Sequence, residues 1–272
     1  MSTSLNFQST CTGVIGVGNM GEALLASLIQ AGVPATNICF SEKRDDRAAE
    51  ISAKYGANRK SNLEIAKDCQ VILLVTKPQD LAALLSEIAP ALADDALLVS
   101  FAAGKTTGFI EECIQKDMAV IRVMPNTPAL IGKGASGIST GSKANATHLK
   151  FVNDFLGACG EAVTVPENLQ DAVTALSGSG PAYFFAFVEA MVAAGIKLGL
   201  SEEIATQLTV QTIYGAAGML KESGKSATTL RENVTSPNGT TAAALASFNE
   251  GGLENLVLSA MTAARNRSQE LA

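Results

Sequence analysis

The chain has 272 residues, of which 47% are apolar and 17% charged, enough to fill the core of one large domain or two modest ones and leave apolar surface over. That surplus predicts a homo-oligomer. The net charge of −6 and the scattered basic residues argue against a nucleic-acid-binding protein, which would carry a basic patch. The sequence shows neither a signal peptide nor an apolar run of about 20 residues. We therefore expect a cytoplasmic protein without a membrane partner.

Short apolar segments alternate with helical patterns from residue 12 to about 124. Strands are predicted at 13–15, 37–41, 71–76, 96–101 and 119–124, and helices near 20–31, 44–55, 78–92 and 106–116. The run from Val71 to Val75 lacks polar alternation, which is typical of a strand covered on both faces. This pattern predicts an α/β fold with a Rossmann-like, doubly wound parallel sheet. A further strand, helix and strand, at about 134–165, are expected to complete it.

The second part of the chain is predicted to be all-α. Helices are expected at 168–176, 181–199, 202–222, 240–250 and 253–270. The 181–199 segment is apolar almost all round, so other helices, including those of a second subunit, must cover it. We therefore divide the chain into an N-terminal domain, 1–164, and a helical domain, 165–272.

A glycine-rich turn follows the first predicted strand. Its pattern, Gly16-x-Gly18-x-x-Gly21, is weak alone, but here an apolar strand precedes it, a helix follows it, and Glu42 lies at the end of the second strand. The glycines allow a tight turn and let a pyrophosphate reach the first N–H groups of the helix. The predicted phosphate-binding residues are Gly16, Val17, Gly18, Asn19, Met20 and Gly21.

The residues after the second strand leave the choice of nucleotide open. Glu42 could accept hydrogen bonds from a ribose 2′-hydroxyl, which favours NADH. Ser41, Lys43, Arg44 and Arg47 surround it and could hold a 2′-phosphate, which favours NADPH. We expect use of either NADPH or NADH, although these charges would also suit a solvated helix start.

Three more predicted strands end in unusual residues. The segments are Val75–Pro78, Ser100–Gly104 and Val123–Pro128. The carboxyl ends of parallel strands share one edge of the sheet, where ligands bind in doubly wound folds. The small residues of the second segment leave room for a nicotinamide ring, so we interpret the three as the lining of one pocket.

Two segments of the helical part are rich in glycine, serine and threonine. Ser177–Tyr183 and Asn233–Thr241 each precede a predicted helix, and each resembles a helix N-terminus left open for an anion. Thr235, Ser236, Thr240 and Thr241 could grip a carboxylate. Simple helix capping is the alternative for each segment.

Cysteine and histidine usage argues against a metal site. The five cysteines (Cys11, Cys39, Cys69, Cys113 and Cys159) are odd in number, widely spaced and without a C-x-x-C pair, which favours reduced, buried thiols. The single histidine, His148, lies in a sequence typical of the start of a surface helix. We therefore predict no metal and no histidine-based mechanism.

With these motifs the chain resembles the pyrroline-5-carboxylate reductases nearly from end to end. The resemblance is carried by Gly16–Gly21, Lys77-Pro78, Ala102–Gly104, Arg122–Pro128, Asp171–Tyr183 and Ser236–Thr241. It implies an N-terminal dinucleotide-binding domain and a helical domain that forms an intertwined homodimer and binds substrate, with rings of dimers as a further expectation. It also implies reduction of 1-pyrroline-5-carboxylate to L-proline, the last step of proline biosynthesis.

The resemblance assigns further site residues. It implies that Asn62, Val75, Lys77, Ala102, Ala103 and Asn233 contact the cofactor, with Thr76 beside them. Ser236, Thr240 and Thr241 would bind the substrate, and Thr241 would act in catalysis by hydrogen-bonding the ring nitrogen; Glu167 would also face the substrate. Two residues depart from the family pattern: Asn238 replaces a glycine and Thr76 replaces a small apolar residue.

Two other functions are compatible with parts of the sequence. β-Hydroxyacid dehydrogenases share the glycine-rich start and would use a lysine of the helical domain, for which Lys197 is the candidate, although its setting is more typical of a helix end. A non-catalytic nucleotide sensor would keep the fold without turnover. The Ser177–Tyr183 segment disfavours the dehydrogenase, and the hydroxyl-rich loops disfavour the sensor.

Overall fold

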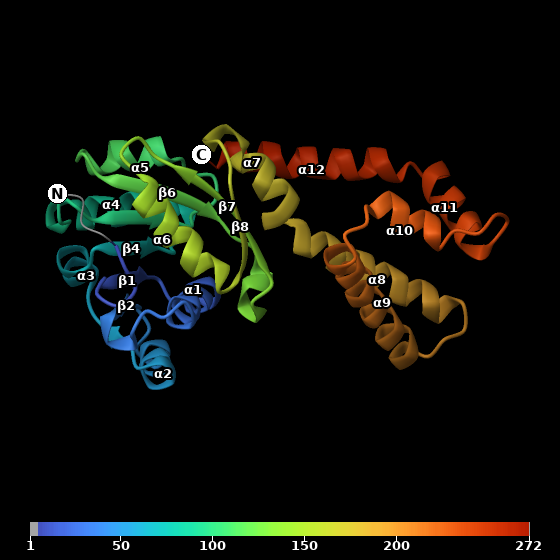
Figure 1. Ribbon diagram of the computed structural model, residues 1–272, viewed down its shortest axis with the longest axis horizontal. Coiled ribbons are helices and arrows are strands. Elements are labelled where there is room, and N and C mark those ends of the chain that lie inside the picture. The colour runs from blue at the N-terminus through green and yellow to red at the C-terminus, as the bar shows by residue number, and fades with distance from the viewer. Residues whose placement is uncertain (1–4, 272) are drawn as a thin grey trace. The chain divides into compact units, whose positions relative to one another are not determined.

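A computed structural model describes residues 5–271, and its chain divides into two compact units (Figure 1). The sheet unit comprises Met1–Ser179 and Ala264–Ala272, and the helical unit comprises Gly180–Ala263. This division falls later than the predicted boundary at 164/165, because residues 165–179 pack on the sheet. Gln170, for example, is fully buried and donates a hydrogen bond to Ser139 Oγ at 2.8 Å.

The sheet unit is built on eight strands in the order β3-β2-β1-β4-β5-β6-β7-β8. The strands are β1 (Thr12–Ile15), β2 (Ile38–Ser41), β3 (Asn58–Arg59), β4 (Val71–Leu74), β5 (Leu97–Ser100), β6 (Ala119–Met124), β7 (Gly134–Thr140) and β8 (Gly160–Thr164). All pairs are parallel except β6 with β7. The connection between those two strands is too short for the crossover that parallel pairing needs.

Helices cover both faces of this sheet (Figure 1). One face packs against α1 (Asn19–Gln30), α2 (Asp45–Tyr55) and α6 (Ala146–Gly157), and the other against α3 (Asn62–Asp68), α4 (Leu81–Ile88) and α5 (Thr107–Ile114). Short 3-10 turns link some of them: η1 (Ala35–Asn37), η2 (Pro78–Asp80), η3 (Ala89–Ala91) and η4 (Thr127–Ile131). The predicted doubly wound α/β fold is confirmed.

One helical run extends from Glu167 to Lys197. It consists of a 3-10 turn, η5 (Glu167–Leu169), then α7 (Gln170–Val173), a π-helical turn, η6 (Thr174–Gly178), and α8 (Gly180–Lys197). The prediction of an open helix N-terminus at Ser177–Tyr183 is therefore wrong. The π turn, in which Ser179 N donates to Thr174 O at 2.8 Å, widens the helix just before Pro181, a residue that has no N–H to donate.

The same run is long and apolar enough to cross a membrane by length and composition alone. This corrects the expectation that no stretch of the chain meets those criteria. The sequence pattern suggested two shorter helices, 168–176 and 181–199, whereas the π turn joins them into one helix of 31 residues.

The helical unit contains α8, α9 (Glu202–Glu222), α10 (Ala227–Asn233), α11 (Thr240–Glu250) and the first part of α12 (Leu253–Glu270). Within residues 181–263 only Ala205 and Thr209 are buried. Large apolar side chains stay exposed, among them Phe184 (63%), Leu208 (56%) and Tyr214 (72%). One chain therefore does not cover the apolar surface of this unit.

The last part of α12 returns to the sheet unit. Ser268 is 3% exposed and its hydroxyl donates to Asp171 Oδ1 at 2.7 Å. A Cβ atom on Gly104 would lie 3.0 Å from the backbone of Leu271. The chain end thus packs directly on the loop that follows β5.

Candidate active site

The glycine-rich turn between β1 and α1 has the close contacts that its sequence predicts. Gly16 has a φ of +95°, and a Cβ atom there would lie 2.5 Å from the Val75 carbonyl oxygen. A Cβ on Gly21 would collide with the Gly16 carbonyl oxygen, whereas a Cβ on Gly18 would meet nothing within 4 Å. Two glycines therefore permit tight packing, and the third borders open space in which a ligand can approach the backbone.

Helix α1 begins without a side-chain cap. Its N-cap is Gly18, and no side chain accepts a hydrogen bond from the first turn. By contrast Ser61, Thr106 and Asn145 cap α3, α5 and α6 through their side chains. The first N–H groups of α1 remain free of such a cap, which together with the helix dipole suits a phosphate group.

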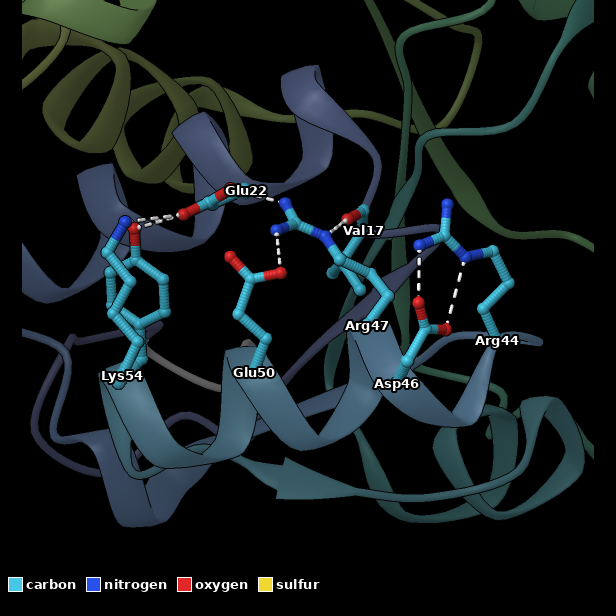
Figure 2. A network of polar contacts seen from close by, with 8 residues as sticks. Val17, Glu22, Arg44, Asp46, Arg47, Glu50 and Lys54 are labelled. Carbon is cyan, nitrogen blue, oxygen red and sulfur yellow. Dashed lines mark hydrogen bonds and ion pairs between the residues drawn. The ribbon is translucent and has the colours of Figure 1, made fainter.

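Figure 2 shows the ion-pair network that fixes α2 against the glycine-rich turn. Arg47 donates to the carbonyl oxygen of Val17 at 3.1 Å and pairs with Glu22 and Glu50. Lys54 and Tyr55 also donate to Glu22, each at 2.8 Å. Hydrogen bonds from Lys54, Arg47 and Tyr55 lower the pKa of Glu22 to about 2. Arg47, which the sequence offered as a 2′-phosphate ligand, instead positions the turn.

Two predicted cofactor residues meet at the end of β2. Ser41 Oγ donates to Asn62 Oδ1 at 2.6 Å, and Asn62 Nδ2 donates to the Glu87 carboxylate at 3.2 Å. Ser61, in a capping box with Glu64, starts α3 and so places Asn62 on its first turn. This joins two residues that are 21 positions apart in the chain at one point of the sheet edge.

The charged residues after β2 remain accessible. Glu42 Oε1 accepts a hydrogen bond from the Arg44 backbone N–H at 3.0 Å, in the turn that leads into α2. The guanidinium group of Arg44 pairs with Asp46 at 2.7 Å and is largely exposed (Figure 2). A surface pair of this kind costs little to open. Both alternatives for the ribose site therefore stay open: Glu42 as the partner of a 2′-hydroxyl, or Arg44 with Lys43 as the partners of a 2′-phosphate.

The ends of β4 and β5 complete this edge of the sheet. The Thr76 hydroxyl is buried without a hydrogen-bond partner beside Val75, whose carbonyl oxygen approaches Gly16. Lys77 follows it as the N-cap of η2. Ala102 is buried and Ala103 half-buried, and both are small. The carboxyl edge of the sheet therefore combines a buried hydroxyl without a hydrogen-bond partner, small side chains and the uncapped first amides of α1. These features fit a bound dinucleotide.

A buried ion pair lies where β6 meets the helical run. Arg122 is 2% exposed and pairs with Glu167 at 2.9 Å and with Asp171 at 3.9 Å. Thr107 donates its hydroxyl to the same Glu167 carboxylate at 3.1 Å. The contact of Glu167 with substrate stays a prediction. Arg122 was not among the site residues predicted from the sequence. A single arginine inside an apolar strand was the signal that could have pointed to it.

The segment Asn233–Thr241 forms the second predicted half of the site, within the helical unit. Asn233 ends α10, Ser236 lies in the following turn, and Gly239 is the N-cap of α11 without any side-chain acceptor. Asn238 has a φ of +60°, as expected where the family has glycine. The Thr235 hydroxyl donates to Arg231 O at 2.6 Å and is therefore occupied. Thr240 and Thr241 start α11 beside its uncapped amides.

The other sequence candidates for chemistry are structural. His148 lies in the first turn of α6 and accepts a hydrogen bond from Asn145 N at 3.3 Å, which confirms the surface-helix reading. Lys197 ends α8, and Gly199 follows with a φ of +103°. The helix-end interpretation of Lys197 is likewise confirmed.

Comparisons with known proteins agree across the chain. A family model for pyrroline-5-carboxylate reductase dimerisation matches residues 167–271, and one for NADP oxidoreductase, coenzyme F420-dependent, matches residues 12–104. A pyrroline-5-carboxylate reductase of Pseudomonas aeruginosa is 44% identical over 260 residues, 95% of each chain.

Two solved structures are similar over nearly their whole length. A pyrroline-5-carboxylate reductase from Coxiella burnetii is 34% identical, with a TM-score of 0.91 over 97% of this chain and 99% of that one. The pyrroline carboxylate reductase of Plasmodium falciparum, with NADP bound, is 32% identical, with a TM-score of 0.87 over 98% and 99%.

Proposed function

The chain belongs to the pyrroline-5-carboxylate reductase family, and we propose that it reduces 1-pyrroline-5-carboxylate to L-proline with NADPH or NADH, the closing step of proline biosynthesis. The observation that carries this proposal is the 44% identity over 95% of both chains, combined with an intact glycine-rich turn. Membership of this family also decides against the hydroxyacid dehydrogenase alternative.

The cofactor is proposed to lie along the carboxyl edge of the sheet. Its pyrophosphate would meet the uncapped start of α1, from Gly16 through Val17, Gly18, Asn19 and Met20 to Gly21. Its adenosine ribose would lie by Ser41, Glu42, Lys43, Arg44 and Asn62, and its nicotinamide by Val75, Thr76, Lys77, Ala102 and Ala103, with Asn233 as an additional contact. When bound, the reduced nicotinamide supplies a hydride.

The substrate is proposed to bind at the start of α11. The free amides of this helix and the hydroxyls of Ser236 and Thr240 would hold the carboxylate, because a helix N-terminus favours an anion. The Thr241 hydroxyl would orient the ring nitrogen, and Glu167 is proposed as a further substrate contact. A protonated imine carbon is already electrophilic, so the protein's task is to orient the reactants and exclude water. Such a mechanism needs no histidine.

The assembly is proposed to be a homodimer built through the second part of the chain, residues 165–272, with rings of dimers as its higher form. The exposed apolar side chains of α8 and α9 and the family model for dimerisation support this. A partner chain would cover the long apolar helix, so we propose an interface helix rather than a membrane span. We likewise propose a cytoplasmic enzyme without membrane or nucleic-acid partners.

The direct test is oxidation of NADPH or NADH by the purified protein with 1-pyrroline-5-carboxylate. Thr241→Ala should lower kcat/KM by about 10–100-fold, the worth of one hydrogen bond to a charged group, and leave cofactor binding intact. Ser247→Ala, an exposed hydroxyl on the same helix, is the matched control.

Three outcomes would contradict these assignments. An unchanged kcat/KM in Thr241→Ala would remove that residue from the mechanism. Oxidation of 3-hydroxyisobutyrate, without imine reduction, would indicate the dehydrogenase function. Tight cofactor binding with no turnover on any cyclic imine would indicate a sensor.

A further inference from the structure

Three cysteines gather at the amino edge of the sheet. Cys11 directly precedes β1, Cys39 is the second residue of β2, and Cys69 lies between α3 and β4. Since β1 lies between β2 and β4 with parallel pairing on both sides, the starts of the three elements are neighbours. The three sulfur atoms lie within 4.8 Å of one another, with Cys11 and Cys69 only 3.3 Å apart.

This cluster stands out from the rest of the described chain. Among residues 5–271 it is the one group of three or more potential metal-ligating side chains whose donor atoms lie this close together. The other two cysteines, Cys113 and Cys159, are not part of it. Wide spacing in the sequence concealed the cluster, because only the strand order brings residues 11, 39 and 69 together.

The triangle of sulfur atoms has the size that a metal requires. With metal–sulfur bonds of about 2.3 Å, three sulfur atoms around a central ion lie about 4.0 Å apart. The observed separations, from 3.3 Å to at most 4.8 Å, bracket this value. Small side-chain rotations would therefore bring the three sulfur–sulfur distances to the value that a central ion requires.

The environment favours a soft ion. Cys39 and Cys69 are buried among Ile65, Ile72 and other apolar side chains, and Cys11 is partly exposed and offers an entry path. Soft thiolate ligands select copper(I) and zinc. Structural zinc takes four ligands, whereas this cluster offers three sulfur atoms, so the geometry suits a three-coordinate ion such as copper(I).

Two neighbours assist such a site. A Cβ atom on Gly13 would lie 3.2 Å from the Cys69 sulfur and would also collide with Ile65, so glycine keeps this space open. Lys60 pairs with Asp68 at 2.7 Å, and its positive charge also interacts with Cys11 and Cys39.

We propose that Cys11, Cys39 and Cys69 form a binding site for one copper(I) ion per chain. Binding replaces the thiol protons by three sulfur–metal bonds and releases those protons to solvent, without any change of oxidation state. The site lies at the amino edge of the sheet, whereas the proposed cofactor site lies at the carboxyl edge. Occupancy is thus independent of the reductase reaction.

The test is an anaerobic titration of the reduced, metal-free full-length protein with copper(I) in competition with bicinchoninate. We expect one copper per chain held against the chelator, and X-ray absorption should give three sulfur ligands at about 2.3 Å. Cys69→Ala should weaken binding at least 100-fold. Cys113→Ala, outside the cluster, should bind copper as the unaltered chain does, and both variants should keep reductase activity.

A second variant guards against loss of the fold, since Cys69 is buried. Cys11→Ser, at the partly exposed position, should also weaken binding while the thermal transition persists. Equal binding in either cluster variant, a two-sulfur site, or failure to hold copper against the chelator would overturn the proposal. So would a four-ligand zinc site that competes out copper, or a Cys11–Cys69 disulfide as the only product.

Discussion

The two units of this chain differ in where their apolar side chains are covered. The sheet unit buries two apolar clusters, one on each face of its sheet, within a single chain. Between residues 181 and 263 only Ala205 and Thr209 are buried, and Phe184, Leu208 and Tyr214 are more than half exposed. One unit is therefore stabilised by its own core, whereas the other leaves most of its apolar side chains uncovered within one chain, as fits its match to a dimerisation model.

The largest expected effect comes from a charge on the exposed face of the helical unit. Phe184→Glu would bury an unpaired carboxylate in each half of a symmetric interface, at about 3–5 kcal/mol each, so the dimer should dissociate and reductase activity should fall. Sedimentation velocity measures the first effect. Thr228→Glu, on an exposed surface of α10, should change neither property. A Phe184→Glu dimer of unchanged stability would place the interface elsewhere.

A methyl group added in the glycine-rich turn should affect the sheet unit and leave the helical unit unchanged. Gly21→Ala would push a Cβ into the Gly16 carbonyl oxygen, which should destabilise the sheet unit by about 1–3 kcal/mol and weaken NADPH binding. Gly18→Ala meets no atom within 4 Å, so it should leave stability intact and weaken binding only. Calorimetry and fluorescence titration separate the two. Unimpaired binding by Gly18→Ala would contradict the pyrophosphate assignment.

The alternation of strands and helices made most of the sheet unit predictable. Every predicted strand and helix has its counterpart within a few residues, since parallel strands covered on both faces carry unbroken apolar runs such as Val71–Leu74. The two-residue strand β3 and the short α3 and α10 were not predicted, because they are too short for a periodic signal. The π turn was missed as well, because Gly178 and Pro181 in sequence are equally typical of a helix start.

A smaller effect is expected from the network that fixes α2 to the turn. The pKa of Glu22 is lowered to about 2 from an ordinary 4.5, so its stabilising contribution is complete above about pH 5 and is lost as the pH falls toward 2. After solvent screening, Glu22→Gln should cost about 1–2 kcal/mol at pH 7. The gap between the parent and variant melting temperatures should close on acidification. A gap that persists at low pH would show that charge is not its cause.

The smallest effect concerns nucleotide choice. Glu42→Ser removes a carboxylate that would accept from the 2′-hydroxyl of NADH and repel the 2′-phosphate of NADPH, so the ratio of kcat/KM values should shift about tenfold toward NADPH. The steady-state rates with each cofactor give this ratio. Asp95→Ser, an acidic residue in a distant turn, serves as the control. An unmoved ratio would mean that Glu42 does not read the ribose.

Backbone conformation was the most predictable part of the candidate site. Gly16 and Gly21 have the conformation or close contacts that the glycine-rich pattern requires, and Asn238 has the left-handed conformation that the resemblance to the family implies. Side-chain partnerships were harder, because they depend on tertiary packing. The position of Arg47 after β2 suggested a ligand of the 2′-phosphate, but its guanidinium group forms an ion pair with Glu22 on the preceding helix. The partners of Arg122 and of Cys39 are likewise distant in the chain.

The return of α12 has a practical consequence for dissecting the chain. Residues 264–271 supply Ser268 and Leu271 to the first unit, so the second unit is an insertion with two covalent connections to it. A recombinant fragment that simply stops at residue 179 would leave Asp171 without Ser268 and uncover the Gly104 loop. Expression of the first unit alone calls for residues 1–179 fused through a short Gly/Ser linker to 264–272.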